Sequence, residues 1–370
     1  MRVMFFIVFL LLVLCALGYV LWHVWCLLPL AKPLKWLAVL LMAAIIVSMF
    51  LFLGGKLDTM PLNMASMMYE VSTSSIIVLL YLVIIFFLMD VARCCHLLPY
   101  SFFHESWIST LSILGLLTAL LLGGNIKYRH KVRVPIELTT DKPIGREYKM
   151  VMVSDLHIGY HNRRAELARW IDLINAEKPD LVLVAGDIID MSMRPVTEEK
   201  MAEEFKRLNA PVYACIGNHE YYGNMPAAKR FYADAGIHLL VDEAAVVDSV
   251  ITIVGRDDRT NPSRKSLDKV VGSAPDSTFT IVLDHQPFEL ERAEQAGVDF
   301  QFSGHTHRGQ VWPISWITDA VYECSFGPWQ KGKTQFYISS GLGIWGGKFR
   351  IGTQSEYIVA TLTQKTTEDL

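Results

Sequence analysis

The sequence predicts two parts in series: four membrane-spanning helices, followed by an α/β domain built on a largely parallel sheet. Charge is the first indication, because residues 1–126 hold only nine charged side chains and the remainder has the charge density of a soluble domain. The second is that short β-branched segments alternate with amphipathic helical segments from about residue 147 onward. With 370 residues, 52% of them hydrophobic, the chain is not a disordered, collagen-like or purely soluble protein.

Four apolar runs without a charged residue predict the membrane part, at residues 3–22, 36–53, 71–89 and 107–124. Each is close to the roughly 17–25 residues that cross a bilayer core as a helix. The alternative for the first run is a cleaved signal peptide, but its uncharged stretch continues to residue 31, far beyond an apolar region of about 7–15 residues. No run carries a charged residue at its centre, so we expect an anchor rather than an ion pathway.

Orientation follows from the basic residues near the helix ends, which concentrate on the cytoplasmic side of membrane proteins. If the N-terminus lies inside the cell, six basic residues lie on the inner side of the membrane: Arg2, Lys56, Lys127, Arg129, Lys131 and Arg133. Three lie on the outer side: Lys32, Lys35 and Arg93. We therefore expect a multi-pass protein of the cell (inner) membrane with its C-terminal domain in the cytoplasm. Export of that domain stays the alternative, because large domains cross regardless of a few charges.

The composition gives the expected boundaries: a transmembrane anchor over 1–126, a juxtamembrane linker over 127–146 and a folded domain over 147–370. The net charge of −3 gives no basic face for nucleic acid. Six cysteines without regular spacing do not indicate a disulfide framework.

Within the domain, buried strands alternate with helices. We predict strands over 150–154, 181–185, 212–216, 251–254, 280–283 and 300–302, and helices over 164–176, 197–208, 226–235 and 288–296. Because ligands bind where the carboxyl ends of parallel strands meet, the residues after each strand are the candidates for a site.

Polar side chains follow five of these strands: Asp155 and His157, Asp187, Asn218 and His219, His285, and His305 with His307. Each motif alone has an ordinary explanation as a turn or a helix cap. Together they include five of the seven histidines in residues 131–370, and we expect His161 and His238 to be surface or structural residues. Imidazole, carboxylate and amide ligands suit divalent Mn, Fe, Zn or Co, and no cysteine lies near these motifs to make a thiolate zinc site.

The series Asp-x-His, Gly-Asp, Gly-Asn-His-Glu, His-x-Pro and Gly-His-Thr-His resembles the calcineurin-like metallophosphoesterases over residues 147–363. The stretches 304–313 and 340–345 are similar to the bacterial membrane-associated phosphoesterases of the YkuE/YaeI type. The resemblance implies a four-layer αββα sandwich, in which two sheets pack together with helices outside.

The resemblance also implies two metal ions and their ligands. One ion would be held by Asp155, His157, Asp187 and His307, and the other by Asp187, Asn218, His285 and His305. His219 would be a catalytic residue beside the substrate rather than a ligand. Two positions depart from the family pattern: Glu220, where many members carry Asp, and Arg308, where Gly is common.

Two divalent ions about 3.5–4 Å apart provide a hydroxide nucleophile and neutralise phosphoryl oxygens during in-line displacement. An imidazole, with an ordinary pKa of about 6.5, suits protonation of the leaving oxygen by His219. The alternative for His219 is a turn residue bonded to the backbone. We therefore expect a membrane-anchored hydrolase of a phosphoester or pyrophosphate bond.

The substrate is less constrained by the sequence. Aromatic residues in the stretch 308–334 and in a later loop suggest a lip that faces the membrane or binds an acyl chain, and the alternative is a small satellite core. They are Trp312, Trp316, Phe326, Trp329 and Trp345. A lipid-linked substrate and contact with membrane lipids are expected, against two alternatives: a tethered phosphodiesterase or phosphatase for soluble substrates, and a silent metal-binding sensor.

Overall fold

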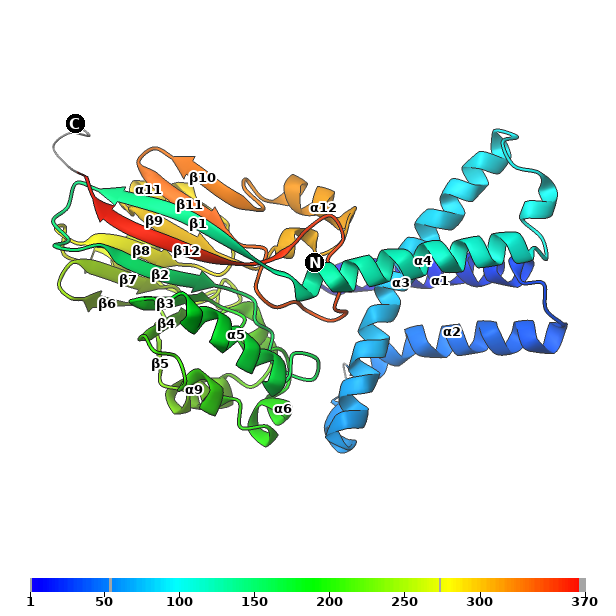
Figure 1. Cartoon of the computed structure of the whole chain (residues 1–370), viewed down its shortest axis with the longest axis horizontal. Coiled ribbons are helices and arrows are strands. Elements are labelled where there is room, and N and C mark those ends of the chain that lie inside the picture. Colours follow the sequence, from blue (N-terminus) through cyan, green and yellow to red (C-terminus); the bar gives the residue numbers. More distant parts are fainter. Residues whose placement is uncertain (1, 53–54, 273, 366–370) are drawn as a thin grey trace. The chain divides into compact units, whose positions relative to one another are not determined.

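The computed structural model describes residues 2–52, 55–272 and 274–365, which fall into two compact units (Figure 1). Unit 1 comprises Met1–Asn125 with Gly346–Lys348, and unit 2 comprises Ile126–Trp345 with Phe349–Leu370. The last residue of the predicted second span, residue 53, and the last five residues of the predicted domain lie outside the described residues.

Unit 1 contains the four predicted helices, the last of them up to Asn125, and each is longer than the run that predicted it. They are α1 (Arg2–Leu27), α2 (Lys32–Phe52), α3 (Leu62–Cys94) and α4 (Trp107–Arg129), with 3-10 turns η1 (Lys56–Thr59) and η2 (Tyr100–Phe102) between them. All four are long and apolar enough to cross a membrane. A helix satisfies its own backbone polar groups, which is what a hydrocarbon environment requires.

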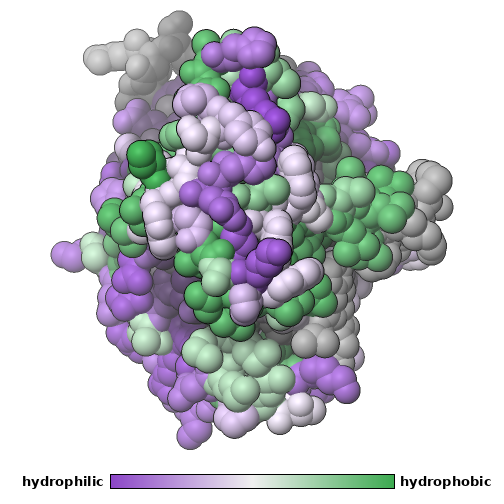
Figure 2. Space-filling view, turned by 90° about the vertical axis from the view of Figure 1, so that its right-hand side faces the viewer, coloured by the Kyte–Doolittle hydropathy of each residue, from purple (hydrophilic) through white to green (hydrophobic). Residues whose placement is uncertain are grey.

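The surface of these helices is apolar. Leu12, Leu37 and Leu122 are 60–64% exposed, and Figure 2 shows hydrophobic surface beside hydrophilic surface on the face that it draws. Exposed apolar area on this scale is unfavourable in water and is covered by lipid in a membrane protein. The carboxylates of Asp90 and Glu105 have partners in this unit, since Tyr19 Oη donates to Asp90 at 2.6 Å and Lys35 Nζ lies 2.8 Å from Glu105.

Unit 2 holds two six-stranded sheets (Figure 1). The first has the order β1 (Lys131–Thr140), β12 (Ser355–Gln364), β2 (Tyr148–Val153), β3 (Leu181–Ala185), β4 (Val212–Cys215) and β5 (Ile237–Leu239). The second has the order β10 (Gly327–Lys331), β11 (Thr334–Ile338), β9 (Phe300–Ser303), β8 (Phe279–Leu283), β7 (Ile251–Gly255) and β6 (Glu243–Val247). Strands β2 to β5 run parallel, as do β7, β8, β9 and β11, so the largely parallel sheet expected from the sequence is present twice.

Alternation along β2 explains why the sheets are buried on both faces. Met150 and Met152 pack in the cluster between the sheets with Leu183 and Ile281, whereas Val151 turns to the other face. There the first sheet is covered by α5 (Arg164–Ala176), α7 (Ala202–Phe205) and α9 (Met225–Asp234), and the second sheet is covered on its outer face by α10 (Leu267–Val271) and α11 (Glu291–Gln295). The four-layer sandwich is therefore confirmed.

Three expectations differ from the structure in detail. Residues 127–146, for which we predicted a linker, contain the end of α4 and all of β1, so only His130 separates the last helix from the first strand. The segment 197–208, where one helix was expected, belongs to two helices, α6 (Met193–Glu198) and α7. Lys200 between them has a φ of 52°, a left-handed conformation that interrupts a right-handed α-helix. The helix expected over 288–296 is the shorter α11.

The strands missed by the sequence analysis are β1, β5, β6, β10, β11 and β12. β1 carries several exposed side chains and a proline, and it is an edge strand whose partner β12 lies more than 200 residues away in the chain. The stretch 308–334 contains helix α12 (Ile314–Val321) and β10 rather than an irregular insertion. Short segments of this kind carry little periodicity of their own.

Candidate metal centre

Five strand ends carry the predicted site residues, and both sheets contribute. β2, β3 and β4 of the first sheet end just before Asp155, Asp187 and Asn218, and β8 and β9 of the second sheet end before His285 and His305. Side chains separated by about 150 residues are thereby brought together: His305 N–H donates to both carboxylate oxygens of Asp155 at 3.1 Å.

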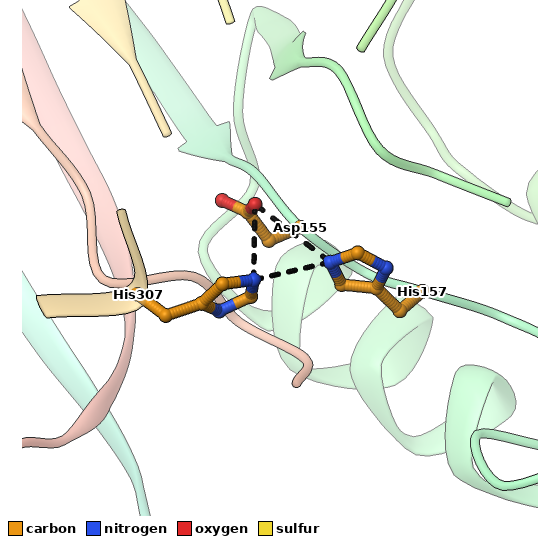
Figure 3. Close-up of side chains that lie close together, drawn as sticks. All are labelled: Asp155, His157 and His307. Carbon is orange, nitrogen blue, oxygen red and sulfur yellow. Dashed lines mark hydrogen bonds and ion pairs between the residues drawn. The ribbon is translucent and has the colours of Figure 1, made fainter. Parts of the chain in front are cut away.

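One group of possible ligands consists of Asp155, His157 and His307 (Figure 3). The Nε2 atoms of the two imidazoles lie 3.1 Å apart, and Asp155 Oδ1 lies 3.4 Å from that of His307 and 3.8 Å from that of His157. Figure 3 shows the three side chains pointing toward one another. Two nitrogens and one oxygen converging in this way fit a divalent ion of the borderline type.

A second group consists of Asp187, His285 and His305. His285 Nδ1 lies 2.8 Å from the carbonyl of Ala185, a contact that requires the proton on Nδ1 and points Nε2, the atom left to bind a metal, into the site. That Nε2 is 3.1 Å from Asp187 Oδ2 and 3.1 Å from Asn218 Oδ1. This hydrogen-bonded tautomer is the one found in metal-bound histidines, so the second group also fits a metal ion.

Asp187 stands between the two groups. Its Oδ2, 3.1 Å from His285 Nε2, is also 3.7 Å from His157 Nε2, while its Oδ1 accepts the backbone N–H of His219 at 2.9 Å. A third group of possible ligands is formed by Asp187 with His157 and His219. One carboxylate oxygen therefore faces both sets of side chains.

Glycines in the motifs allow the loops to approach this closely. A Cβ added to Gly217 would lie 2.1 Å from Asp187 Oδ1, and one added to Gly304 would lie 2.3 Å from Asp155 Oδ2. No side chain fits at either place. The Gly-Asn-His and Gly-His-Thr-His motifs therefore need their first residue for packing.

Five candidate ligands have left-handed backbone conformations, with φ of 45–69° at Asp155, His157, Asp187, His305 and His307. Such conformations cost energy for residues other than glycine and persist where surrounding contacts enforce them. The backbone N–H of Asp155 bonds to Gly186 O and that of His157 to Asp187 O, which are two such contacts. Strained backbone at ligand positions is typical of functional sites.

His219 is oriented by Asp190, a residue that the sequence analysis missed. His219 Nδ1 lies 2.9 Å from Asp190 Oδ1, and the carboxylate is 2% exposed. Glu220, where the family often has Asp, serves the loops instead: it accepts the backbone N–H groups of Gly217 and Ile189 at 2.9 and 3.0 Å. The available signal was an aspartate three residues after Asp187, in Gly-Asp-Ile-Ile-Asp.

Arg350 is a second missed residue. Its fully buried guanidinium donates to the carbonyls of His307 at 2.9 Å, Ser340 at 2.6 Å and Gly343 at 2.9 Å. Burial lowers the pKa of Arg350 to about 10, so the group stays charged at neutral pH. It ties the 3-10 turn η3 (His307–Gly309) to the loop after β11, and no sequence motif marks it.

Protonation in the cluster follows from burial and pairing. Burial lowers the pKa of His305 to about 4, and that of His307 falls well below its usual value for the same reason, so both imidazoles are neutral ligands at pH 7. Burial opposes charge on His157 as well, but hydrogen bonds to Asp155 and Asp190 outweigh it and raise the pKa of His157 to about 10. A metal ion would displace that proton, which couples metal binding to pH.

The other sequence expectations divide as follows. His161 is buried with Nε2 2.6 Å from Ile344 O, and His238 is exposed beside Tyr213; neither belongs to the groups of possible metal ligands found among the described residues. Of the aromatic residues in question, Trp312, Trp316, Trp329 and Trp345 are exposed, and Phe326 is partly buried beneath the Arg308 guanidinium at 4.5 Å. The satellite-core alternative does not hold for the four tryptophans.

Comparison with known proteins agrees with this geometry. The family model described as "Calcineurin-like phosphoesterase" matches residues 148–309. The metallophosphoesterase YkuE of Bacillus subtilis is 30% identical over 269 residues, which cover 66% of this chain and 92% of YkuE. The chain therefore belongs to the calcineurin-like metallophosphoesterase family.

Two further relatives share less of their length. A metallophosphoesterase of Helicobacter pylori is 27% identical over 60% of this chain and 61% of its own length. A bovine transmembrane protein with a metallophosphoesterase domain is 27% identical over 67% of this chain and 59% of its own length. The chain thus spans about three fifths of these two relatives. Together with the four apolar helices, the likeness to transmembrane relatives indicates a membrane protein.

Proposed function

We propose that the protein is a membrane-anchored, metal-dependent phosphoesterase that hydrolyses a phosphoester or pyrophosphate bond. The observation that carries the proposal is the position of Asp187 Oδ2, 3.1 Å from His285 Nε2 and 3.7 Å from His157 Nε2. One oxygen shared by two sets of ligands is the arrangement that a two-metal site requires.

Each proposed ion has four protein ligands, with Asp187 common to both sets. The first set adds Asp155, His157 and His307, and the second adds Asn218, His285 and His305. The donors suit Mn, Fe, Zn or Co. Such ions, when bound, lower the pKa of water and neutralise phosphoryl oxygens.

The chain's own contribution to bond cleavage is proton transfer by His219. Its Nδ1 is occupied by Asp190 at 2.9 Å, so Nε2 is the atom that donates a proton to the departing oxygen. The buried Asp190 carboxylate fixes the orientation of the His219 ring through this hydrogen bond. Arg350, by binding the carbonyl of His307, holds one ligand loop in place.

This proposal is tested by measuring hydrolysis of a soluble dialkyl phosphodiester, whose alkoxide leaving group needs a proton, with metal-loaded full-length protein in detergent. Substitution His219→Ala should lower turnover by about 10²–10⁴-fold, the usual size of a general-acid effect. The matched control His238→Ala, at an exposed histidine, should leave turnover unchanged. Hydrolysis that survives complete chelation of metal, or wild-type turnover in His219→Ala, contradicts the proposal.

A lipid-linked substrate is supported by helix α12. Its Trp316 and Ile317 are 64% and 59% exposed, and Val321 lies one turn after Ile317, which makes an apolar stripe along one side. The first turn of α12 packs on Gly309, two residues after His307, because a Cβ there would lie 2.4 Å from Ser315 N. The apolar stripe therefore begins beside a candidate ligand loop.

The substrate proposal is tested by comparing a detergent-dispersed lipid phosphoester with the soluble diester. Trp316→Ser should lower kcat/KM for the lipid ester by about tenfold, the effect of losing one large apolar contact, and leave the soluble ester unaffected. Val246→Ser, at an exposed apolar residue on β6, is the control. Equal rates on both esters in wild type and Trp316→Ser would instead indicate a tethered enzyme for soluble substrates.

We propose in addition that unit 2 faces the cytoplasm. Lys127 and Arg129 in the last turn of α4, with Lys131 and Arg133 at the start of β1, support this orientation. A cysteine at the exposed Ser263 should resist impermeant thiol reagents in intact cells, while native Cys94 and Cys95, at the end of α3, should react. The opposite labelling pattern reverses the orientation.

A further inference from the structure

A groove lies between α2 and α3 of unit 1, with a volume of about 660 Å³. That volume is in the range of about 300–1,000 Å³ found for small-molecule sites. Its lining includes Ala38 and Leu41 on α2, and Glu70, Ser74, Val78 and Leu82 on α3. The lining residues Leu41 and Val71 are 58% and 48% exposed, so the groove opens at the surface of the helices, which lipid covers if both span a membrane.

The groove has the length of one lipid chain. Its lining positions on α3 recur every fourth residue from Glu70 to Leu82, so they form one stripe along the helix. Twelve residues at about 1.5 Å each give a stripe of about 18 Å. One leaflet of a bilayer, half of a core about 30 Å thick, is similar in depth.

Polarity changes along the groove in the order found in a lipid. Glu70 and Ser74 lie at one end, and Val78 and Leu82 at the other. At the polar end, Lys348 Nζ lies 3.1 Å from Glu70 Oε1, with 21% of the lysine side chain exposed. An ammonium at this position can bind a phosphate as well as the carboxylate.

The backbone around Lys348 is fixed within unit 1. Asn125 Nδ2 donates to the carbonyl of Lys348 at 2.9 Å. A Cβ on Gly347 would lie 3.0 Å from Ser74 Cα, so the glycine permits a close approach to α3. The lysine is therefore positioned by the bundle rather than carried on a free loop.

We propose that this groove binds one hydrocarbon chain of a phosphate-bearing membrane lipid, with the phosphate at Lys348. Lys348 precedes by two residues Arg350, which donates to the carbonyl of the candidate ligand His307. A role for the bound lipid in hydrolysis rests on the proposed function, whereas binding itself does not.

The test uses full-length His219→Ala protein, so that hydrolysis cannot remove the probe. It is reconstituted in phosphatidylcholine vesicles containing phosphatidylglycerol with a photoreactive acyl chain, and labelling of α2 and α3 is measured by peptide mass spectrometry. Adding Ala38→Phe fills the groove and should reduce labelling about tenfold or more, as expected for an overpacked site. Adding Ala44→Phe, on the exposed side of the same helix, should not. Equal labelling in the two variants overturns the proposal.

A second variant tests the phosphate. Lys348→Gln should keep the hydrocarbon chain in the groove but remove most of the preference for phosphatidylglycerol over a photoreactive diacylglycerol, which lacks phosphate. If phosphatidylglycerol and diacylglycerol label the protein that retains Lys348 equally, the headgroup is not recognised. That result overturns the proposed phosphate site at Lys348. Because each readout is labelling, loss of the lipid site and loss of the hydrolase proposal are separate outcomes.

Discussion

Replacing Asp190 by asparagine tests whether a buried carboxylate acts through His219. The two side chains meet at 2.9 Å with Asp190 only 2% exposed, so solvent screens the contact little. A hydrogen bond to a charged group contributes about 1.5–3 kcal/mol and a neutral one about 0.5–1.5 kcal/mol. The difference of about 1–2 kcal/mol predicts that Asp190→Asn lowers kcat by about 5- to 30-fold.

The assay measures kcat, KM and metal content on the same preparations. Metal content must be checked because Asp190 Oδ1 also lies 3.6 Å from Nδ1 of the candidate ligand His157. Asp234→Asn, at the exposed end of α9, is the matched control and should change nothing. KM should stay within about twofold, since the contact acts on proton transfer rather than on substrate binding.

A double substitution gives the result that can refute the reasoning. If Asp190 works through the imidazole, adding Asp190→Asn to His219→Ala should cost no further activity. A full additional loss in that background, with metal content unchanged, would mean that the carboxylate acts elsewhere. An unchanged kcat in Asp190→Asn alone would likewise refute a role for this hydrogen bond in catalysis.

Three further outcomes are expected. Asp187→Asn should reduce retention of both metal ions, because one carboxylate serves both ligand sets; two ions per chain by elemental analysis would contradict the shared role. Arg350→Met should destabilise the protein by at least about 1–3 kcal/mol in thermal unfolding, since buried carbonyls lose their donor, and Arg350→Lys should restore only part because an ammonium cannot reproduce the guanidinium fork. Glu177 has its pKa lowered to about 2, first by the Arg133 hydrogen bond and then by Lys149 against the effect of burial. Its stabilisation, about 1 kcal/mol, is therefore present above the unfolded pKa of about 4.3 and lost as pH falls toward the folded value. Glu177→Gln should remove that part of the acid sensitivity, and an unchanged pH profile of unfolding would exclude the pair as its source.

The sequence by itself determined the elements whose signal is local. Uncharged runs of helical length are sufficient for α1 to α4, because each such helix satisfies its own backbone polar groups. Strands β2, β3, β4, β7, β8 and β9 are buried on both faces and therefore appear as continuous apolar segments. The polar residues directly after these strands marked the site, since parallel strands present their carboxyl ends to one crevice.

Only the tertiary structure decided which side chains support that site. Asp190 looks like any turn aspartate until its carboxylate is found 2.9 Å from His219, and Arg350 gains its role from carbonyls of loops as far as 43 residues away. β1 and β12, near opposite ends of unit 2, define each other by pairing rather than by their own periodicity. Local pattern reports burial and backbone preference, whereas hydrogen-bond partners distant in the chain depend on how the sheets and loops pack, which no single segment encodes.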